Sequence, residues 1–259
     1  MSTEPFYGED QAAIHHERFG DLAVLAADVL LTRLRAARFS AGTVVDLGCG
    51  SGILARIVSD AGYDVVGVDV SAAMVALAAP QAPRATFVQG TLLDVPLPPA
   101  VAVTAVGEVL NYATAPPAGL AELEAIVERV AGVLAPGGLF VFDVAAPGRN
   151  GPTGVRERFH THSDWALHAR AVESPEGDRL DRDITIFRRT GDAEYRRTDE
   201  HHVLRLYRPD VVEDVLDRAG FAVERGAVYG ETTSASTPAT GWAVFVARSP
   251  GPTRLTAVH

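Results

Sequence analysis

The chain has 259 residues, of which 47% are hydrophobic and 22% are charged, so it can form one large domain or at most two small ones. Acidic residues outnumber basic residues 33 to 23, and the net charge of −10 argues against a general affinity for nucleic acid. All basic residues are arginines, which excludes a Schiff-base lysine for pyridoxal phosphate and a complete Walker-type phosphate loop. Cys49 is the single cysteine, so an intramolecular disulfide and a multi-cysteine zinc site are excluded.

The first residues, MSTEPFYGEDQ, are acidic and include no apolar segment, so we expect no signal peptide. No run of about 18 apolar residues occurs, and we therefore expect no membrane span. These features predict a cytoplasmic protein of the size of an enzyme, with neither nucleic acid nor membrane as a partner. The sequence leaves open whether it is a monomer or a homodimer.

Residues 1–42 are expected to form a helical lid, because apolar side chains recur at three- and four-residue intervals over residues 9–38. Residues 43–149 alternate short apolar strands with helices. Strands are predicted at residues 43–47, 64–69, 85–89, 101–106 and 139–144, and helices at residues 51–61, 72–79 and 119–134. This alternation is typical of a doubly wound parallel sheet, which binds ligands at the carboxyl ends of its strands.

Residues 150–208 have a different pattern, which predicts an antiparallel meander inserted as a cap over the sheet. Its three expected strands are residues 164–173, 179–188 and 194–207. Residues 209–248 complete the core, with a helix at 210–220 and a pair of strands at 221–229 and 242–248, and residues 249–259 are expected to be a flexible tail. The predicted fold is therefore α/β: a Rossmann-like, mostly parallel seven-stranded sheet with a helical lid and an antiparallel β cap.

The most informative motif is Asp46-Leu47-Gly48-Cys49-Gly50-Ser51-Gly52, which leaves a predicted strand and opens a helix. Its glycines allow a tight turn and the close approach of a ligand, and the helix N-terminus offers unpaired N–H groups. Asp69 ends the next strand, where a carboxylate can accept hydrogen bonds from both hydroxyls of a ribose. The loop and Asp69 together predict a nucleoside-binding crevice.

The spacing of the glycines distinguishes between classes of nucleoside ligand. A dinucleotide fingerprint has the pattern GxGxxG, whereas this loop has GxGxG with Asp46 two residues before it. A carboxylate there would repel a pyrophosphate but suits an ammonium or a sulfonium group. Residues 44–52 resemble the first motif, V-x-D-x-G-C-G-x-G, of the class I S-adenosylmethionine-dependent methyltransferases.

This resemblance implies S-adenosyl-L-methionine as the cofactor. It places Asp46 at the amino group of the methionine and Asp69 at the ribose. The family usually has an acid after the third strand to bind the adenine; Thr91 stands there, with the Leu92 N–H as a further donor to the ring. The full set of cofactor-binding residues that we expect is Asp46, Gly48, Gly50, Gly52, Asp69, Val70, Thr91, Leu92 and Glu108.

Residues 14–21 and 195–207 resemble a subgroup of stand-alone bacterial methyltransferases that act on small molecules, and the meander resembles the cap of sugar N-methyltransferases. In residues 200–207, strand alternation places Glu200 and His202 on one face, where His202 could act as a general base with Glu200 beside it. Expected substrate-binding residues are His15 on the lid, and Asn111 and Tyr112 after the fourth strand. His160, His162 and Asp164 alternate like metal ligands, but nothing else marks a metal site and we expect none.

The sequence therefore predicts a methyltransferase that moves a methyl group to an O, N or C atom of a small-molecule acceptor. Catalysis is expected to come mainly from proximity and orientation, with possible general-base help from His202. Two alternatives stay open: a protein that binds S-adenosylmethionine for another reaction or for regulation, and a nicotinamide-dependent oxidoreductase. The missing GxGxxG spacing disfavours the oxidoreductase.

Overall fold

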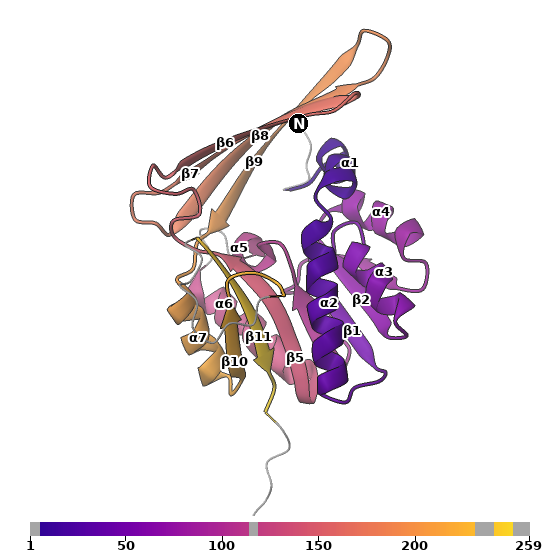
Figure 1. Ribbon diagram of the computed structural model, residues 1–259, viewed down its shortest axis with the longest axis vertical. Helices are drawn as coiled ribbons and strands as arrows, with labels where there is room; N and C mark the ends of the chain where they lie inside the picture. The colour runs from indigo at the N-terminus through magenta and orange to yellow at the C-terminus, as the bar shows by residue number, and fades with distance from the viewer. Residues whose placement is uncertain (1–5, 114–118, 231–240, 251–259) are drawn as a thin grey trace, which may run out of the picture.

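The computed structural model describes residues 6–113, 119–230 and 241–250, and its core is one large sheet (Figure 1). The strands of this sheet are β1 (Thr43–Leu47), β2 (Asp64–Asp69), β3 (Thr86–Gln89), β4 (Ala100–Ala105), β5 (Leu134–Ala145), β10 (Ala222–Gly226) and β11 (Trp242–Arg248). They lie in the order β10-β11-β5-β4-β1-β2-β3, and only β11 runs antiparallel to its neighbours. The expected seven-stranded, mostly parallel sheet is confirmed.

Helices cover both faces of the sheet, as Figure 1 shows. They are α2 (Asp21–Ala36), α3 (Ile53–Asp60), α4 (Ala72–Gln81), α5 (Val109–Ala113), α6 (Leu120–Val133) and α7 (Pro209–Arg218). Val44 and Val45 are adjacent on β1, so their side chains leave the strand on opposite faces. Both are fully buried because helices cover both faces. Val44 belongs to a cluster with side chains of α2 and α3, and Val45 to one with α5, α6 and α7.

A second sheet of four antiparallel strands stands over the core as a cap (Figure 1). Its strands, in order, are β6 (Val155–Thr161), β7 (Trp165–Glu173), β8 (Arg179–Arg189) and β9 (Tyr195–Arg205). The sequence predicted only three of these, and the missing strand is β6. Because β6 is an edge strand in which every residue except His160 is exposed, it carries no alternation of apolar and polar side chains.

From residue 6 onward, two helices precede β1. α1 (Glu9–Arg18) ends at Phe19, and α2 begins after Gly20. A Cβ on residue 20 would lie 2.6 Å from the terminal methyl group of Ile53 of α3, so glycine allows this close approach without a shift of that side chain. The break separates α2, which packs on the core sheet, from α1, whose Ile14 packs against Trp165 and Ile186 of the cap.

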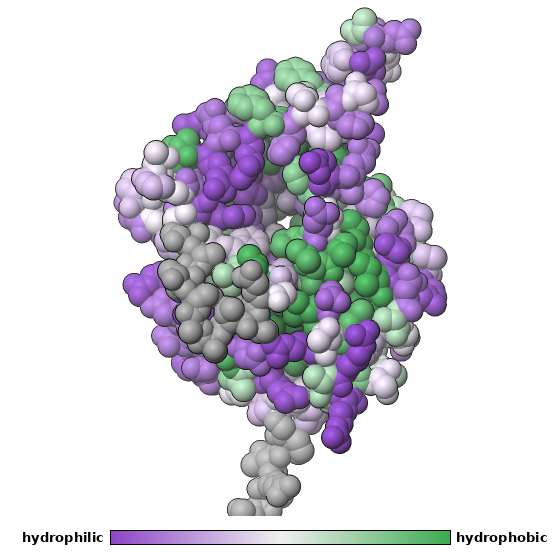
Figure 2. All heavy atoms as spheres, viewed as in Figure 1, coloured by the Kyte–Doolittle hydropathy of each residue, from purple (hydrophilic) through white to green (hydrophobic). Residues whose placement is uncertain are grey.

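The surface of the molecule is uneven in polarity. Figure 2 shows apolar surface gathered on the core around α2, where the side chains of Val24 and Leu25 are 48% and 50% exposed. Within the part of the chain that the structure describes, no helix is both long enough and apolar enough to cross a membrane.

Asp10 fastens α1 to the cap. Its carboxylate is only 3% exposed and accepts hydrogen bonds from Arg188, Arg196 and Thr198 at distances between 2.5 and 3.3 Å. Burial by itself would raise the pKa of Asp10, but the hydrogen bonds from Arg196 and Thr198 outweigh it, and the pKa is lowered. The ionised carboxylate is therefore the form that the folded chain stabilises.

We expect Asp10→Ala to lower the free energy of unfolding in urea by about 1–3 kcal/mol, because it removes hydrogen bonds between charged groups whose arginines can return to water. Amide hydrogen exchange should become faster in α1 while the core strands remain protected. Asp199→Ala is the control, because Asp199 makes similar pairs with Arg197 and Thr185 on the exposed face of β9. An equal loss of stability in both variants would contradict a special role for Asp10.

Candidate functional site

A cavity of about 420 Å³ lies at the carboxyl ends of β1, β2, β3 and β4. This is the edge at which the loops of a doubly wound sheet converge. The core contributes Gly48, Gly50, Val68, Asp69, Val70, Met74, Gly90, Thr91, Leu92, Leu93, Asp94, Val106, Gly107, Val109 and Tyr112, and the N-terminal part contributes Phe6, Tyr7, His15, Phe19, Leu22 and Ala23. The wall is mostly apolar, with a few polar groups that can orient a ligand.

The glycine loop forms one wall, and Gly48 and Gly50 line the cavity. Gly48, Gly50 and Gly52 all have left-handed backbone conformations, with φ of 64°, 52° and 78°. A Cβ at Gly48 would lie 2.4 Å from Val109, so both the backbone angle and the packing require glycine there. Gly52 is not part of the wall; it precedes α3 and packs against Ala78.

Asp69 presents its carboxylate at the end of β2. One oxygen accepts a hydrogen bond from the Gly50 amide at 2.8 Å, and the other accepts one from the Ser71 amide at 2.9 Å. Burial raises the pKa of Asp69, although these amides oppose the shift. The carboxylate thus joins the glycine loop after β1 to the loop after β2, and it lines the cavity.

Asp46 lies at the end of β1 but does not border the cavity. One carboxyl oxygen accepts a hydrogen bond from the Thr104 hydroxyl at 2.7 Å, and the other is buried without a partner in the described part of the chain. Burial raises the pKa of Asp46 to about 7, and the neighbouring Asp69 adds to the shift. A cationic group nearby would relieve both the missing hydrogen bond and the cost of burying the charge.

The opposite end of the cavity is lined by Val70, Thr91, Leu92 and Asp94. The Thr91 hydroxyl donates to the Asp94 carboxylate at 2.6 Å. Sequence reasoning did not identify Asp94, which supplies a carboxylate three residues after the position where one was expected. The sequence did contain a signal for Asp94, because it is an acidic residue in the turn at residues 90–95.

A short N-terminal strap, residues 6–8, closes the cavity from above. The Ser71 hydroxyl donates to the Tyr7 carbonyl at 2.7 Å, and the amides of Tyr7 and Gly8 donate to the Glu200 carboxylate at 2.9 and 3.0 Å. The strap is thus held by the core on one side and by the cap on the other. Tyr7 has a φ of 55°, which is uncommon outside glycine and is held here by these hydrogen bonds.

His15 of α1 also borders the cavity. Burial lowers the pKa of His15 to about 4, and the neighbouring His16 contributes, so the imidazole is neutral at pH 7. Its Nδ1 atom is buried without a partner among the described residues. His16 lies beside it and pairs with the Ser51 hydroxyl of the glycine loop at 2.8 Å.

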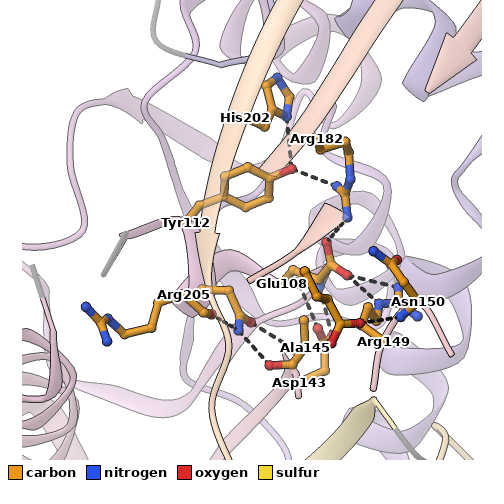
Figure 3. A network of polar contacts seen from close by, with 12 residues as sticks. Glu108, Tyr112, Asp143, Ala145, Arg149, Asn150, Arg182, His202 and Arg205 are labelled. Carbon is orange, nitrogen blue, oxygen red and sulfur yellow. Dashed lines mark hydrogen bonds and ion pairs between the residues drawn. The ribbon is translucent and has the colours of Figure 1, made fainter. Parts of the chain in front are cut away.

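Glu108 does not reach the cavity, because its carboxylate turns away between two guanidinium groups (Figure 3). Arg149 and Arg182 each donate to it at 2.9 Å. These arginines outweigh the effect of burial and lower the pKa of Glu108. Its φ of 66° and the hydrogen bonds from the Gly107 and Glu108 amides to Asp143 fix this orientation.

Tyr112 and His202 continue the same network (Figure 3). The Tyr112 hydroxyl lies 3.0 Å from His202 Nδ1 and accepts a hydrogen bond from Arg182 at 2.9 Å. His202 Nε2 lies 2.8 Å from the Glu200 carboxylate. Tyr112 lines the cavity, whereas His202 is fully buried behind it and does not.

Asn111 is fully buried and also lies outside the wall. Its amide nitrogen donates to the carbonyls of Ala145 and Arg205, and its amide oxygen accepts from the Ala145 amide. These hydrogen bonds join α5 to β5 and β9, so no polar atom of its side chain is directed to a ligand.

The described residues include no group of three or more His, Cys, Asp or Glu side chains arranged to hold a metal ion. His160 lies on β6, whereas His162 and Asp164 lie in the turn that follows, so the three residues do not share a strand face. His162 stacks on Trp165 instead.

Comparison with known proteins agrees with this geometry. Residues 45–142 match the family model described as a methyltransferase domain. A malonyl-(acyl-carrier protein) O-methyltransferase from Enterobacter lignolyticus is 38% identical over 87 residues, which are 34% of each chain. The chain thus matches about a third of the length of that relative.

Solved structures share the fold over nearly the whole chain. An S-adenosylmethionine-dependent methyltransferase from Clostridium acetobutylicum is 17% identical, with a TM-score of 0.79 and coverage of 93% of this chain and 98% of that one. An amino pentose methyltransferase from Micromonospora echinaspora, with S-adenosylmethionine bound, is 22% identical, with a TM-score of 0.70 and coverage of 95% and 99%. The match thus shows that residues 45–142 are a methyltransferase domain, and the solved structures show that the chain has the fold of S-adenosylmethionine-dependent methyltransferases.

Proposed function

We propose that this protein transfers a methyl group from S-adenosylmethionine to an oxygen, nitrogen or carbon atom of a small molecule. The observation that carries the proposal is the wall formed by Gly48, Gly50 and Asp69, which offers a ligand exposed backbone and a carboxylate in one cavity. The similar O-methyltransferase supports an oxygen atom as the acceptor, and the amino pentose methyltransferase supports a small molecule that carries an amine.

The residues present fit the cofactor. Asp46 has a buried carboxyl oxygen without a partner, which suits the ammonium of the methionine part, either directly or through a water molecule. Asp69 would accept hydrogen bonds from the ribose, and Thr91 with Asp94 would face the adenine. When it is bound, S-adenosylmethionine supplies a methyl group that its sulfonium already activates.

The protein's own task is then to align the acceptor and to exclude water. The strap over the cavity and the apolar wall serve this purpose, and orientation alone can supply up to roughly 7–11 kcal/mol in well-oriented model reactions. We propose that His202 takes up the proton that the acceptor loses, with Glu200 holding the ring. His202→Ala should then slow turnover and leave cofactor binding intact.

The first test is a thermal-shift comparison of S-adenosylmethionine, S-adenosylhomocysteine and NAD(H). A ligand at about 100 times its dissociation constant stabilises the fold by roughly 2.7 kcal/mol, which is a shift of several degrees. We expect shifts with the first two ligands only, and formation of S-adenosylhomocysteine when amines and alcohols are screened as acceptors. A shift with NAD(H) alone would overturn the proposal. Binding without turnover of any acceptor would favour a role that does not involve methyl transfer.

Gly107 and Gly62 form a matched pair for testing the cavity. Their φ angles are 95° and 98°, and an added Cβ would have no protein atom within 4 Å at either position. Only Gly107 borders the cavity. Both alanine variants should lose about 1–2 kcal/mol of stability because of the left-handed backbone. Only Gly107→Ala should weaken S-adenosylhomocysteine binding, by about tenfold or more in calorimetry; equal affinities in the two variants would place the ligand elsewhere.

Asp46 should make the stability of the ligand-free protein depend on pH. Its pKa is about 7 in the folded chain against a usual value of 3.8, so between these values the folded state binds more protons than the unfolded state. Stability should therefore fall as the pH rises from about 4 to 7, and then level off. Asp46→Asn should flatten this fall in the melting temperature between pH 5 and 7.5. A smaller slope should remain, because burial also raises the pKa of Asp143, to about 6.

The control for this measurement is Asp64→Asn, at the exposed first position of β2. That side chain is in water in both states, so the variant should keep the wild-type slope. If the melting temperature of Asp46→Asn fell with pH as steeply as that of the wild type, Asp46 would not be the source of the pH dependence.

A further inference from the structure

His202, the general base proposed above, is separated from the cavity by another side chain. His202 is fully buried and does not border the cavity, so a ligand there cannot touch its imidazole. The residue between them is Tyr112, which lines the cavity and whose hydroxyl lies 3.0 Å from His202 Nδ1. A proton that leaves the acceptor therefore has a path to His202 through the phenol oxygen.

The surroundings of Glu200 set the direction of these hydrogen bonds. Its carboxylate accepts from the amides of Tyr7 and Gly8, and the side-chain amide of Gln11 can donate to it as well. A carboxylate surrounded by donors is ionised and can only accept, so His202 Nε2 carries a hydrogen and donates to it. In the neutral ring, Nδ1 is then an acceptor, and the Tyr112 hydroxyl donates to it.

Tyr112 keeps its phenol proton until it receives one from the acceptor, which a relay requires. Burial raises the pKa of Tyr112, so the phenol is protonated at neutral pH, while Arg182 opposes this shift. Arg182 donates to the phenol oxygen at 2.9 Å and would stabilise negative charge that develops there. The Tyr7 ring of the strap lies beside that of Tyr112, with ring centroids 6.2 Å apart, so the O–H or N–H of an acceptor would approach the phenol oxygen next to the strap.

We propose that Tyr112, His202 and Glu200 form a relay in which Tyr112 is the residue that contacts the acceptor. The inference rests on the proposed methyl transfer and narrows the acceptor to one that carries a hydrogen on its nucleophilic nitrogen or oxygen. As that atom forms its bond to the methyl carbon, the carbon–sulfur bond breaks and its electron pair stays on sulfur. The acceptor's proton goes to the Tyr112 oxygen while the phenol proton goes to His202 Nδ1. The positive charge lost from sulfur is then on the imidazolium, which is paired with Glu200.

The tautomer of His202 tests the relay without any acceptor. The full-length protein, labelled with ¹⁵N in its histidine rings, is examined by NMR at pH 7.5 with and without S-adenosylhomocysteine. The His202 signals are those that move in Tyr112→Phe, and His201→Asn removes the signals of the exposed neighbouring histidine. We expect a neutral ring with its hydrogen on Nε2. A hydrogen on Nδ1, or on both nitrogens, would overturn the relay because Nδ1 could not take up a proton.

Glu200→Gln tests the direction of the relay. The glutamine amide can donate to His202 Nε2, so the ring hydrogen should move to Nδ1, which would then donate to Tyr112 and block uptake of a proton. This variant and Tyr112→Phe preserve the size of the buried side chains, so they avoid the cavity that His202→Ala would leave. A ring that stays in the Nε2–H form in Glu200→Gln would contradict the inferred direction.

Turnover provides the second measurement, with an amine or alcohol found in the acceptor screen. Tyr112→Phe should lower kcat by about 100-fold or more, which is the usual contribution of a general base, and change the S-adenosylhomocysteine dissociation constant by less than twofold. His201→Asn should leave both unchanged. Full activity in Tyr112→Phe would overturn the relay. If the wild-type chain neither binds S-adenosylhomocysteine nor turns over, the proposed function has failed, and the tautomer result remains a separate finding about the network.

Discussion

The carboxylate of Glu200 joins the N-terminal strap to the cap, two parts of the chain that are far apart in sequence. It accepts hydrogen bonds from the amides of Tyr7 and Gly8 in the strap and from His202 on its own strand of the cap. The strap is also held by Ser71 of the core, so the residues that cover one side of the cavity are held by both the core and the cap. Burial of the polar groups around the cavity strengthens the electrostatic interactions among them. The altered pKa values of the neighbouring groups follow from this burial.

The buried carboxylates fall into two groups according to their partners. Glu108 lies between two arginines, which lower its pKa, and it serves as a structural ion pair. Asp46 and Asp143 have only neutral hydrogen-bond donors, and burial raises their pKa values to about 7 and about 6. A buried carboxyl group without a cation is neutralised by protonation or by a ligand that brings positive charge. Asp46 is the member of this second group that has an oxygen left without a partner among the described residues.

Backbone strain is concentrated around the same cavity. Among the described residues, the non-glycine positions with positive φ are Tyr7, Arg38 and Glu108, and two of these three flank the site. Each of the two is held by hydrogen bonds to a carboxylate, Tyr7 by Glu200 and Glu108 by Asp143. Such conformations cost on the order of 1–3 kcal/mol and persist only where the surrounding structure enforces them. The backbone conformation of Glu108 turns its side chain away from the cavity, and that of Tyr7 places the strap along the cavity wall.

Local patterns in the sequence were enough to predict the fold and the place of Gly48, Gly50 and Asp69 in the cavity wall, because strand alternation and glycine spacing act over a few residues. They also placed Glu200 and His202 on one strand face. Only the tertiary structure decided which partners the other predicted residues have. The carboxylate of Glu108 binds Arg149 and Arg182, and the side chain of Asn111 forms hydrogen bonds with backbone groups. Tyr112 lies between His202 and the cavity. The tertiary structure likewise brought Asp94 to the wall and revealed the exposed edge strand β6. These contacts join residues up to 94 positions apart, and no local pattern encodes which distant side chains will meet once the layers have packed.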